Sequence, residues 1–178
     1  MISVYALSTE NLSRSKQELN KLWWVYKQNL QKILNSKKIR KNNVRVNVIG
    51  NSNIWRSDVR QTAKDVEKAT EDYAKIIWNI LLAYGSQFEI LSAIKKVVKT
   101  GVKAVPPLRD AFVKHLMINR PVDLIIRTGG QYRLSNFLLY QSAYSEIYFS
   151  PTLWPEFSRK EFEKILRWFW SQRRKFGK

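Results

Sequence analysis

Four polar residues in the C-terminal third of the chain have types and spacing that could bind a phosphate ester. They are Arg127, Arg133, Ser135 and Glu146. Two guanidinium forks can grip the oxygens of a diphosphate, and a serine hydroxyl can donate to the same oxygens. A carboxylate nearby could hold a metal ion that the phosphates also bind. Spacing alone favours a simpler interpretation, a basic loop with Glu146 in a surface ion pair.

The elements around these residues would place them where α/β proteins bind anions. The apolar run Val122 to Ile126 predicts a buried strand that ends at Arg127. Gly129–Gly130 then allows a tight turn or a close approach to a ligand. Ser135 stands where the N-cap of a helix would stand, before a run of apolar residues. We therefore expect Arg127 at the carboxyl end of a strand and Arg133 beside a helix N-terminus, two positions that attract anions.

Strands and helices alternate along the whole chain. Apolar patterns predict strands at 2–7, 44–48, 76–83 and 122–126, and a further strand at the end of the run that closes at Phe149. Capping boxes at Ser15–Glu18 and Ser158–Glu161, together with helical apolar spacing, predict helices over 19–34, 59–73, 90–98, 108–116 and 162–169. This order predicts an α/β fold in a single domain over residues 1–178, with a mainly parallel sheet flanked by helices on both faces. Because a buried strand starts almost at the first residue, we expect the front of this fold to be incomplete.

The composition points to an anionic partner. The chain has 32 lysines and arginines against 14 aspartates and glutamates, which gives a net charge of +18. Such a balance favours nucleic acid, an anionic membrane surface or a phosphate-bearing substrate. The 7 Trp, 8 Tyr and 8 Phe could stack on bases or lie at a membrane interface, but most aromatic residues fill a core.

Other features narrow the choice of function. The chain has no cysteine, so disulfides and cysteine-bound metals are excluded. Its one histidine, His115, is expected to be an ordinary surface or packing residue. No apolar run is long enough to span a bilayer, and no signal peptide is recognisable. We expect a cytoplasmic protein that can also contact the membrane surface.

Three runs in the C-terminal third resemble the signature of the cis-prenyltransferases, the undecaprenyl diphosphate synthase family. They read Arg127-Thr-Gly-Gly, Arg133-Leu-Ser-Asn-Phe-Leu-Leu-Tyr-Gln and Ala143-Tyr-Ser-Glu-Ile-Tyr-Phe. The likeness continues over nearly the whole chain, and it includes Val4–Asn11, Arg14, Val48–Gly50, Asn79, Tyr84–Gly85, Trp154–Pro155 and Arg174–Gly177. The resemblance implies the family's α/β fold, with its first strand and helix missing here.

The resemblance also implies a reaction. In this family the diphosphate of an allylic prenyl substrate leaves with the help of Mg²⁺, and the double bond of isopentenyl diphosphate attacks. A proton is lost and a new cis double bond forms. By resemblance, isopentenyl diphosphate is bound by Arg127, Arg133, Leu134 and Ser135. Glu146 is the metal-side carboxylate, reached across the interface of a symmetric homodimer.

The N-terminal motif is implied to serve the allylic substrate. Ser8, Thr9 and Glu10 would line its site, and Arg14 would bind a phosphate. Asn11 would be the catalytic residue that orients or relays the departing proton. Without the resemblance, we would interpret residues 8–11 as a polar cap between a strand and a helix.

The chain departs from the family pattern at four places. Leu12 replaces the usual Trp, Gln131 replaces an acidic residue, and Ser86–Gln87 stands where an arginine is expected. The family's Asp-Gly-Asn-x-Arg loop, whose aspartate is central to metal and allylic diphosphate binding, does not occur in the sequence. The chain is therefore either a fragment or a shortened relative, and we expect weak activity or none from it alone.

Two alternatives to a self-sufficient enzyme remain. The chain could be a non-catalytic subunit that lends Arg127, Arg133 and Glu146 to a complete prenyltransferase in a heteromer. It could also be a basic nucleic-acid-binding protein, in view of its charge and aromatic residues. The second alternative is less favoured because no helix-turn-helix, RRM or zinc pattern occurs.

Overall fold

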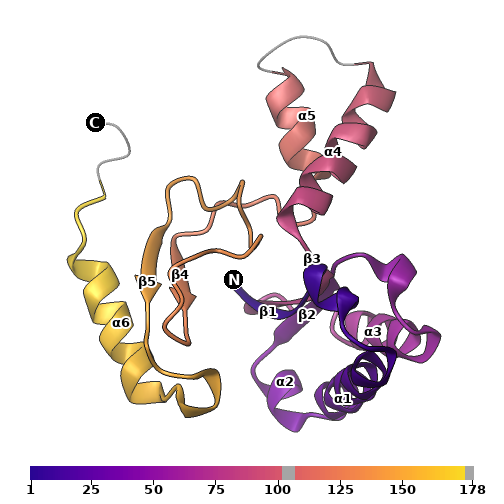
Figure 1. Cartoon of the computed structure of the whole chain (residues 1–178), viewed down its shortest axis with the longest axis horizontal. Coiled ribbons are helices and arrows are strands. Elements are labelled where there is room, and N and C mark those ends of the chain that lie inside the picture. The colour runs from indigo at the N-terminus through magenta and orange to yellow at the C-terminus, as the bar shows by residue number, and fades with distance from the viewer. Residues whose placement is uncertain (102–106, 175–178) are drawn as a thin grey trace. The chain divides into compact units, whose positions relative to one another are not determined.

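The computed structural model describes residues 1–101 and 107–174, and the chain divides into two compact units, Met1–Glu89 and Ile90–Lys178. Each unit is described by itself below, with the element labels of Figure 1. Of the motif at Arg174–Gly177, only Arg174 is among the described residues, and the rest of the motif lies outside them. The prediction that residues 1–178 form a single domain stays a prediction.

The first unit is built on a three-stranded parallel sheet. Its strands are β1 (Ile2–Ser8), β2 (Val44–Ile49) and β3 (Ile76–Tyr84), in the order β1-β3-β2. In register, Ile80 of β3 lies between Val4 of β1 and Val48 of β2. The predicted central position of β3 is therefore confirmed, and its last four residues are all buried. These parallel pairs bring the carboxyl ends of β1 and β3 to the same edge of the sheet.

The sequence suggests a buried first strand, but β1 is only half-buried. Its residues are apolar on both faces, which is typical of a strand inside a parallel sheet. Only Leu7 is buried, and Ile2 is 55% exposed. Among the described residues the sheet ends at β1, because β1 pairs with β3 and with no second strand. The apolar pattern was correct for a strand and wrong about its burial.

Helices α1 (Lys16–Leu34), α2 (Lys37–Lys41) and α3 (Ser57–Ala69) cover β2 and its neighbours (Figure 1). The helix start predicted at Ser15 is confirmed, because the Ser15 hydroxyl accepts the Glu18 backbone N–H at 3.3 Å as an N-cap. α1 packs against α3, and α3 packs against β2. The core between these layers contains Leu7, Trp23, Leu30, Val46, Val59, Ala63, Val66 and Leu82. Single-turn 3₁₀ helices at Glu10–Ser13 and Ser52–Ile54 complete the connections.

The second unit contains two helices, a pair of strands and a last helix. α4 (Ser86–Thr100) starts in the first unit and ends before Gly101, which has a φ of +71° and stops the helix as expected. α5 (Pro107–His115) confirms the predicted helix near 108–116. The strands β4 (Leu124–Arg127) and β5 (Glu146–Phe149) pair in parallel. A 3₁₀ turn at Trp154–Glu156 leads into α6 (Arg159–Ser171), which Ser158 caps at the Glu161 N–H.

The helix predicted after Ser135 is wrong. Residues 135–144 form successive turns and bends, and Ser135, Asn136 and Leu138 have φ angles of 49°, 63° and 43°. Positive φ at these residues is incompatible with a right-handed helix. Tertiary contacts hold the turns, because Leu138 is buried and Gln141 donates through Nε2 to the Ile118 carbonyl at 2.8 Å. Ser135 is consequently not an N-cap.

Every described strand pair is parallel, and helices separate the strands along the chain except between β4 and β5, which confirms the predicted α/β class. No helix among residues 1–101 and 107–174 combines the length and the apolar character needed to cross a bilayer.

Candidate functional site

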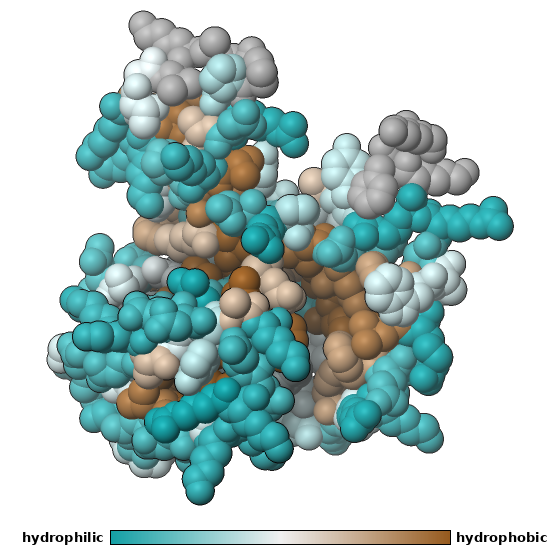
Figure 2. Space-filling model, turned by 180° about the vertical axis from the view of Figure 1, so that it is seen from behind, coloured by the Kyte–Doolittle hydropathy of each residue, from teal (hydrophilic) through white to brown (hydrophobic). Residues whose placement is uncertain are grey.

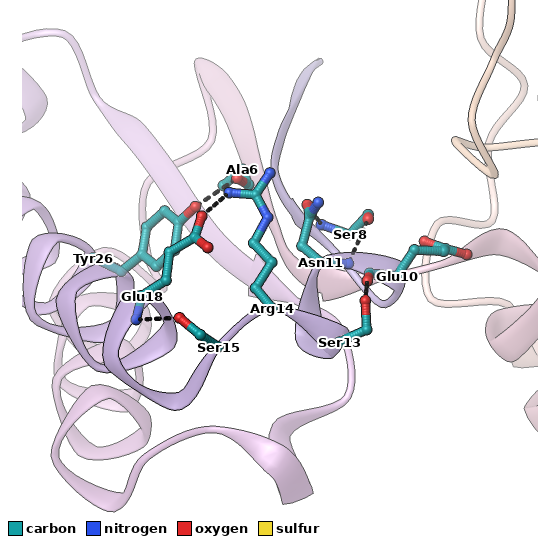
Figure 3. Close-up of polar contacts among 9 residues, drawn as sticks. All are labelled: Ala6, Ser8, Glu10, Asn11, Ser13, Arg14, Ser15, Glu18 and Tyr26. Carbon is teal, nitrogen blue, oxygen red and sulfur yellow. Dashed lines mark hydrogen bonds and ion pairs between the residues drawn. The ribbon is translucent and has the colours of Figure 1, made fainter.

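The predicted residues at the carboxyl end of β1 form a closed polar loop (Figure 3). The Ser8 backbone N–H donates to Asn11 Oδ1 at 3.1 Å, and the Asn11 N–H donates to Ser8 Oγ at 3.3 Å. The Thr9 N–H donates to the Tyr84 carbonyl at 3.0 Å, which ties the loop to the end of β3. The reciprocal bonds resemble a helix cap, as the simpler interpretation of these residues expected. They also fix the Asn11 amide, with Oδ1 accepting and Nδ2 as the donor it presents.

Arg14 and Glu10 lie on either side of this loop with different surroundings. Arg14 Nη1 is 2.6 Å from Glu18 Oε1, in an exposed ion pair between residues four apart in sequence. In the view of Figure 3 the Arg14 side chain runs between Glu18 and Asn11, whereas the Glu10 carboxylate points away from Arg14. Burial raises the pKa of Tyr26 above its usual value, and the positive charge of Arg14 opposes that rise. The Tyr26 hydroxyl donates to the Ala6 carbonyl of β1 at 2.6 Å, so Arg14 acts on a group that is bonded to this strand.

A buried acid lies next to the loop, and sequence reasoning missed it. Glu89 in the first turn of α4 is 1% exposed, and the buried Tyr84 hydroxyl donates to its Oε2 at 2.5 Å. Burial, followed by the negative charge of Glu89, raises the pKa of Tyr84 far above its usual value. The phenol therefore stays protonated and donates to the carboxylate. An acid placed in a first helical turn, directly after a Tyr-Gly strand end, was the signal that could have identified it.

Arg127 lies where it was predicted, at the carboxyl end of β4. Its carbonyl accepts the Ser150 N–H at 2.7 Å. Gly129 and Gly130 have φ angles of 88° and 65°, and both bond to the segment that follows β5. The Gly129 N–H donates to the Thr152 carbonyl at 2.8 Å. The Gly130 N–H donates to the Ser150 carbonyl at 2.9 Å. The glycine loop is thus held at the edge where ligands bind in parallel sheets.

Arg133 is near this loop in sequence, but its predicted setting is wrong. Because no helix starts after Ser135, a helix N-terminus does not flank the guanidinium. Arg133 Nη1 instead donates to Gln131 Oε1 at 2.6 Å, and both side chains are exposed. Ser135 is exposed and Leu134 is half-buried in the same segment. The guanidinium is held by a neutral amide, so its charge stays available to an anion.

Glu146 and Arg127 lie at opposite ends of the β4–β5 pair. Glu146 is the first residue of β5 and pairs with Leu124, whereas Arg127 pairs with Phe149 at the far end. Three residue steps separate the two ends, which is roughly 10 Å along a strand. Within one chain, Glu146 therefore does not lie beside the Arg127 loop. The structure places no group of three or more His, Cys, Asp or Glu together among the residues it describes.

The predicted residues therefore form two groups, each inside one unit. Ser8, Thr9, Glu10, Asn11 and Arg14 gather at the end of β1 in the unit Met1–Glu89. Arg127, Arg133, Leu134 and Ser135 follow β4 in the unit Ile90–Lys178, and Glu146 stands apart from them at the start of β5. Both groups could bind anions, the first through Arg14 and backbone-fixed amides and the second through two guanidinium forks.

Comparison with protein families and with known proteins gives a consistent result. Residues 1–177 match the family described as "Putative undecaprenyl diphosphate synthase". The chain is 39% identical over its whole length to a tritrans,polycis-undecaprenyl-diphosphate synthase (geranylgeranyl-diphosphate specific) of Pyrococcus abyssi, and it covers 70% of that protein. It is also 39% identical over its whole length to a farnesyl-diphosphate-specific ditrans,polycis-undecaprenyl-diphosphate synthase of Buchnera aphidicola, and it covers 72% of that protein.

Two solved structures have the same fold. One is described as a "probable undecaprenyl diphosphate synthase" from Campylobacter jejuni, with a TM-score of 0.90 and 35% identity over 99% of this chain and 82% of that one. The other is lavandulyl diphosphate synthase from Lavandula x intermedia in complex with dimethylallyl diphosphate. Its TM-score is 0.87, with 27% identity over 99% of this chain and 78% of that one.

Proposed function

Because this chain belongs to the undecaprenyl diphosphate synthase family, we propose that it carries the site that condenses isopentenyl diphosphate with an allylic prenyl diphosphate in cis geometry. The observation that supports this most is the Arg127–Gly130 loop. It lies at the carboxyl end of a parallel strand and is bonded through both glycine amides to the segment after β5. The match to the family covers that loop and the Ser8–Asn11 loop together.

The proposed reaction needs positive charge around two diphosphates. The bond between the allylic carbon and its diphosphate oxygen breaks, and the oxygen keeps the electron pair. The double bond of isopentenyl diphosphate supplies the electrons for the new carbon–carbon bond. A proton then leaves the carbon beside the new cation, and the cis double bond forms. Arg127 and Arg133 hold the diphosphate of the attacking unit, because guanidinium forks match its oxygens.

The Ser8–Asn11 loop serves the allylic substrate in this proposal. Asn11 Oδ1 accepts the Ser8 N–H, so the amide NH₂ of Asn11 is the group that would donate to ligand oxygens. That donor, together with Arg14, stabilises the negative charge that develops on the departing diphosphate. Ser8, Thr9 and Glu10 line the same side of the site, and Asn11 orients or relays the departing proton.

We propose Mg²⁺ as the cofactor, with Glu146 as one of its ligands. Mg²⁺ is commonly held by one or two protein carboxylates and by phosphate oxygens, so a site with one carboxylate per chain is compatible with it. The ion would neutralise charge on the leaving diphosphate. Because Glu146 lies at the opposite end of the strand pair from Arg127, we propose that it serves the site of a second copy in a homodimer. A heteromer with a complete prenyltransferase would also let Glu146 serve the site of another chain.

The sequence contains no Asp-Gly-Asn loop, so we propose that this chain alone elongates prenyl chains slowly. Binding of isopentenyl diphosphate does not need that loop and is the direct test of the proposed site. Titration calorimetry should show saturable binding that weakens by about 10-fold or more in Arg127→Ala, because a lost charged bond to phosphate costs about 1.5–3 kcal/mol. Equal binding by Arg127→Ala and the unchanged chain would contradict the assignment. We further propose a cytoplasmic location for the protein.

A further inference from the structure

The ladder between β1 and β3 contains two bulges just before the Ser8–Asn11 loop. The pairs along this part of the ladder are Tyr5 with Leu81, Leu7 with Leu82, and Ser8 with Tyr84. Ala6 is therefore an extra residue on β1, and Ala83 is an extra residue on β3. The second bulge cancels the shift that the first one introduces, so Ser8 returns to the register that the strands have before Ala6. The position of the loop at the end of the sheet thus depends on both bulges.

Ala83 has a left-handed backbone conformation at the second bulge. It is fully buried, and its φ is +50°. A residue with a Cβ is strained in this conformation, which persists only where surrounding contacts hold it. The last three carbonyls of β3 accept such contacts: Leu82 from Trp55 Nε1 at 3.1 Å, Ala83 from the Asn51 N–H at 3.2 Å, and Tyr84 from the Thr9 N–H at 3.0 Å. The strained residue therefore connects the loops after β1 and β2 to the end of β3.

The carbonyl of Ala6, the extra residue on β1, is held by a side chain of α1. The Tyr26 hydroxyl donates to it at 2.6 Å (Figure 3). The Tyr26 ring packs against the apolar core of the first unit and meets Trp23 edge to face, with the ring centroids 6.3 Å apart. Hydrophilic side chains cover most of this unit on the face shown in Figure 2, at the lower left of the view. Tyr26 therefore combines a ring packed on the core with a hydroxyl that is bonded to the first bulge.

We propose that Tyr26 is a positioning residue for the Ser8–Asn11 loop, and that its hydroxyl acts by holding the bulge at Ala6. A bulge leaves its extra residue without a partner in the ladder, so the donor from α1 replaces the lost ladder bond. Without this donor, β1 can move by one residue along β3, which is about 3.3 Å. Ser8 would then leave its place beside Tyr84, and the loop would lose its attachment to the end of β3.

This positioning would matter for the proposed reaction. Asn11 and Arg14, which are proposed to stabilise the departing diphosphate, both follow the bulge along the chain. A misplacement of such groups by about 1 Å can lower a rate about 100-fold. This consequence rests on the proposed function, whereas the position of the loop is measured without any ligand, so the two can fail separately.

The first test is amide hydrogen exchange, followed by NMR, in the unchanged chain and in Tyr26→Phe. This variant keeps the packed ring and removes only the hydroxyl. The backbone amides of Ser8, Thr9 and Asn11, which bond within the loop and to β3, should exchange about 10-fold faster. Two buried amides of β2 bond to side chains elsewhere in the unit, and they should change less than about 2-fold. They belong to Val46 and Val48. Equal acceleration of both sets, or none at the loop, would overturn the proposal.

A matched variant separates this role from general stability. Thr62→Val removes another hydroxyl in the same unit, one that donates to the Asp58 carbonyl at 2.9 Å within α3 and touches neither bulge. Its loop amides should exchange within about 2-fold of those in the unchanged chain, even where the melting temperature falls as much as in Tyr26→Phe. If Thr62→Val accelerates the loop amides as much as Tyr26→Phe, exchange at the loop follows stability alone, and the proposal is overturned.

The second test is titration calorimetry with the two diphosphates separately. Tyr26→Phe should bind farnesyl diphosphate about 10-fold more weakly, because the lost bond loosens the loop proposed for the allylic substrate. Its affinity for isopentenyl diphosphate should change less than about 2-fold, because Arg127 belongs to the other unit. Equal affinities of Tyr26→Phe and the unchanged chain for farnesyl diphosphate would overturn the part of Tyr26 in the reaction. Failure of the unchanged chain to bind isopentenyl diphosphate would instead contradict the proposed function, whatever the exchange rates show.

Discussion

Arg127 and Glu146 lie at opposite ends of the β4–β5 ladder, because Arg127 pairs with Phe149 and Glu146 pairs with Leu124. Two parallel strands cannot bring these side chains together within one chain without loss of register. If both residues act on one pair of diphosphates, a carboxylate from another copy would account for this separation, as we propose. The strand register therefore connects the proposed chemistry to assembly.

The first prediction concerns shared sites. Arg127→Ala and Glu146→Ala should each lose most of the activity of the unchanged chain. Mixing them after unfolding and refolding should restore about a quarter of that activity, because half of the dimers are mixed and each mixed dimer has one intact site of two. Chain elongation with labelled isopentenyl diphosphate measures this. If the mixture stays as inactive as its parts, Glu146 does not serve the partner's site.

The second prediction concerns the buried pair beside the Ser8–Asn11 loop. Tyr84→Phe removes the hydroxyl that donates to Glu89 and leaves a buried carboxylate short of one donor. The free energy of unfolding should fall by about 1–3 kcal/mol. Urea unfolding followed by circular dichroism measures it. Tyr132→Phe is the control, since Tyr132 is 78% exposed, and it should change stability by less than ~0.5 kcal/mol. Equal effects of the two variants would exclude a structural role for the Tyr84 hydroxyl.

The third prediction concerns pH and the contact between α1 and α3. Asp58 Oδ1 accepts a hydrogen bond from Arg56 Nε at 2.6 Å, and Asp58 Oδ2 lies 3.2 Å from Lys27 Nζ. The hydrogen bond from Arg56, followed by the contact with Lys27, lowers the pKa of Asp58 well below its usual value. A lowered folded-state pKa stabilises the fold above the unfolded pKa of about 4, and the contribution disappears as pH falls through the folded value.

Asp58→Asn should therefore destabilise the chain at pH 7 by about 1 kcal/mol or less, because solvent screens these partly exposed charges. The difference from the unchanged chain should shrink as pH falls below about 4. Urea unfolding at several pH values measures it. A difference that stays constant down to pH 2 would mean that packing, rather than the charge of Asp58, connects the helices.

The fourth prediction concerns the turn after β2. Gly50 has a φ of +153°, and a Cβ added there would lie 2.0 Å from the Leu82 carbonyl oxygen. Gly50→Ala should therefore destabilise the first unit by about 3 kcal/mol or more, because backbone would have to move. Gly101→Ala is the control: its φ is also positive, but nothing lies within 4 Å of an added Cβ. Its cost should be about 1 kcal/mol. Thermal unfolding compares the two variants, and equal losses would contradict the steric argument.

Local sequence signals predicted most of the elements. The capping boxes at Ser15 and Ser158 gave the starts of α1 and α6, because the N-cap bond depends on residues only three apart. The apolar runs at residues 2–7 and 76–83 predicted strands correctly, because the pattern of a strand is also contained within a few neighbouring residues. Burial of β1 was not predictable in this way, because it depends on which strand lies beside it and not on its own pattern.

The segment after Arg133 shows why part of the site could not be predicted. Its composition favours a helix, yet bonds such as Gln141 Nε2 to the Ile118 carbonyl, between residues distant in sequence, hold it in turns with positive φ. Tertiary contacts of this kind override local propensity. The pair of Tyr84 and Glu89 was missed for a related reason, since a buried acid is recognised by its surroundings. Arg127 was placed correctly because its position follows from the strand alone.

The central claim is that Arg127 grips a diphosphate during cis-prenyl transfer, and one measurement tests it most directly. The 178-residue chain is incubated with Mg²⁺, labelled isopentenyl diphosphate and either farnesyl or geranylgeranyl diphosphate, alone and after addition of an upstream segment that carries the Asp-Gly-Asn loop. We expect slow formation of longer polyprenyl products by the chain alone, faster formation with the added segment, and loss of both in Arg127→Ala. No product from the extended chain, or equal product from Arg127→Ala, would contradict the account.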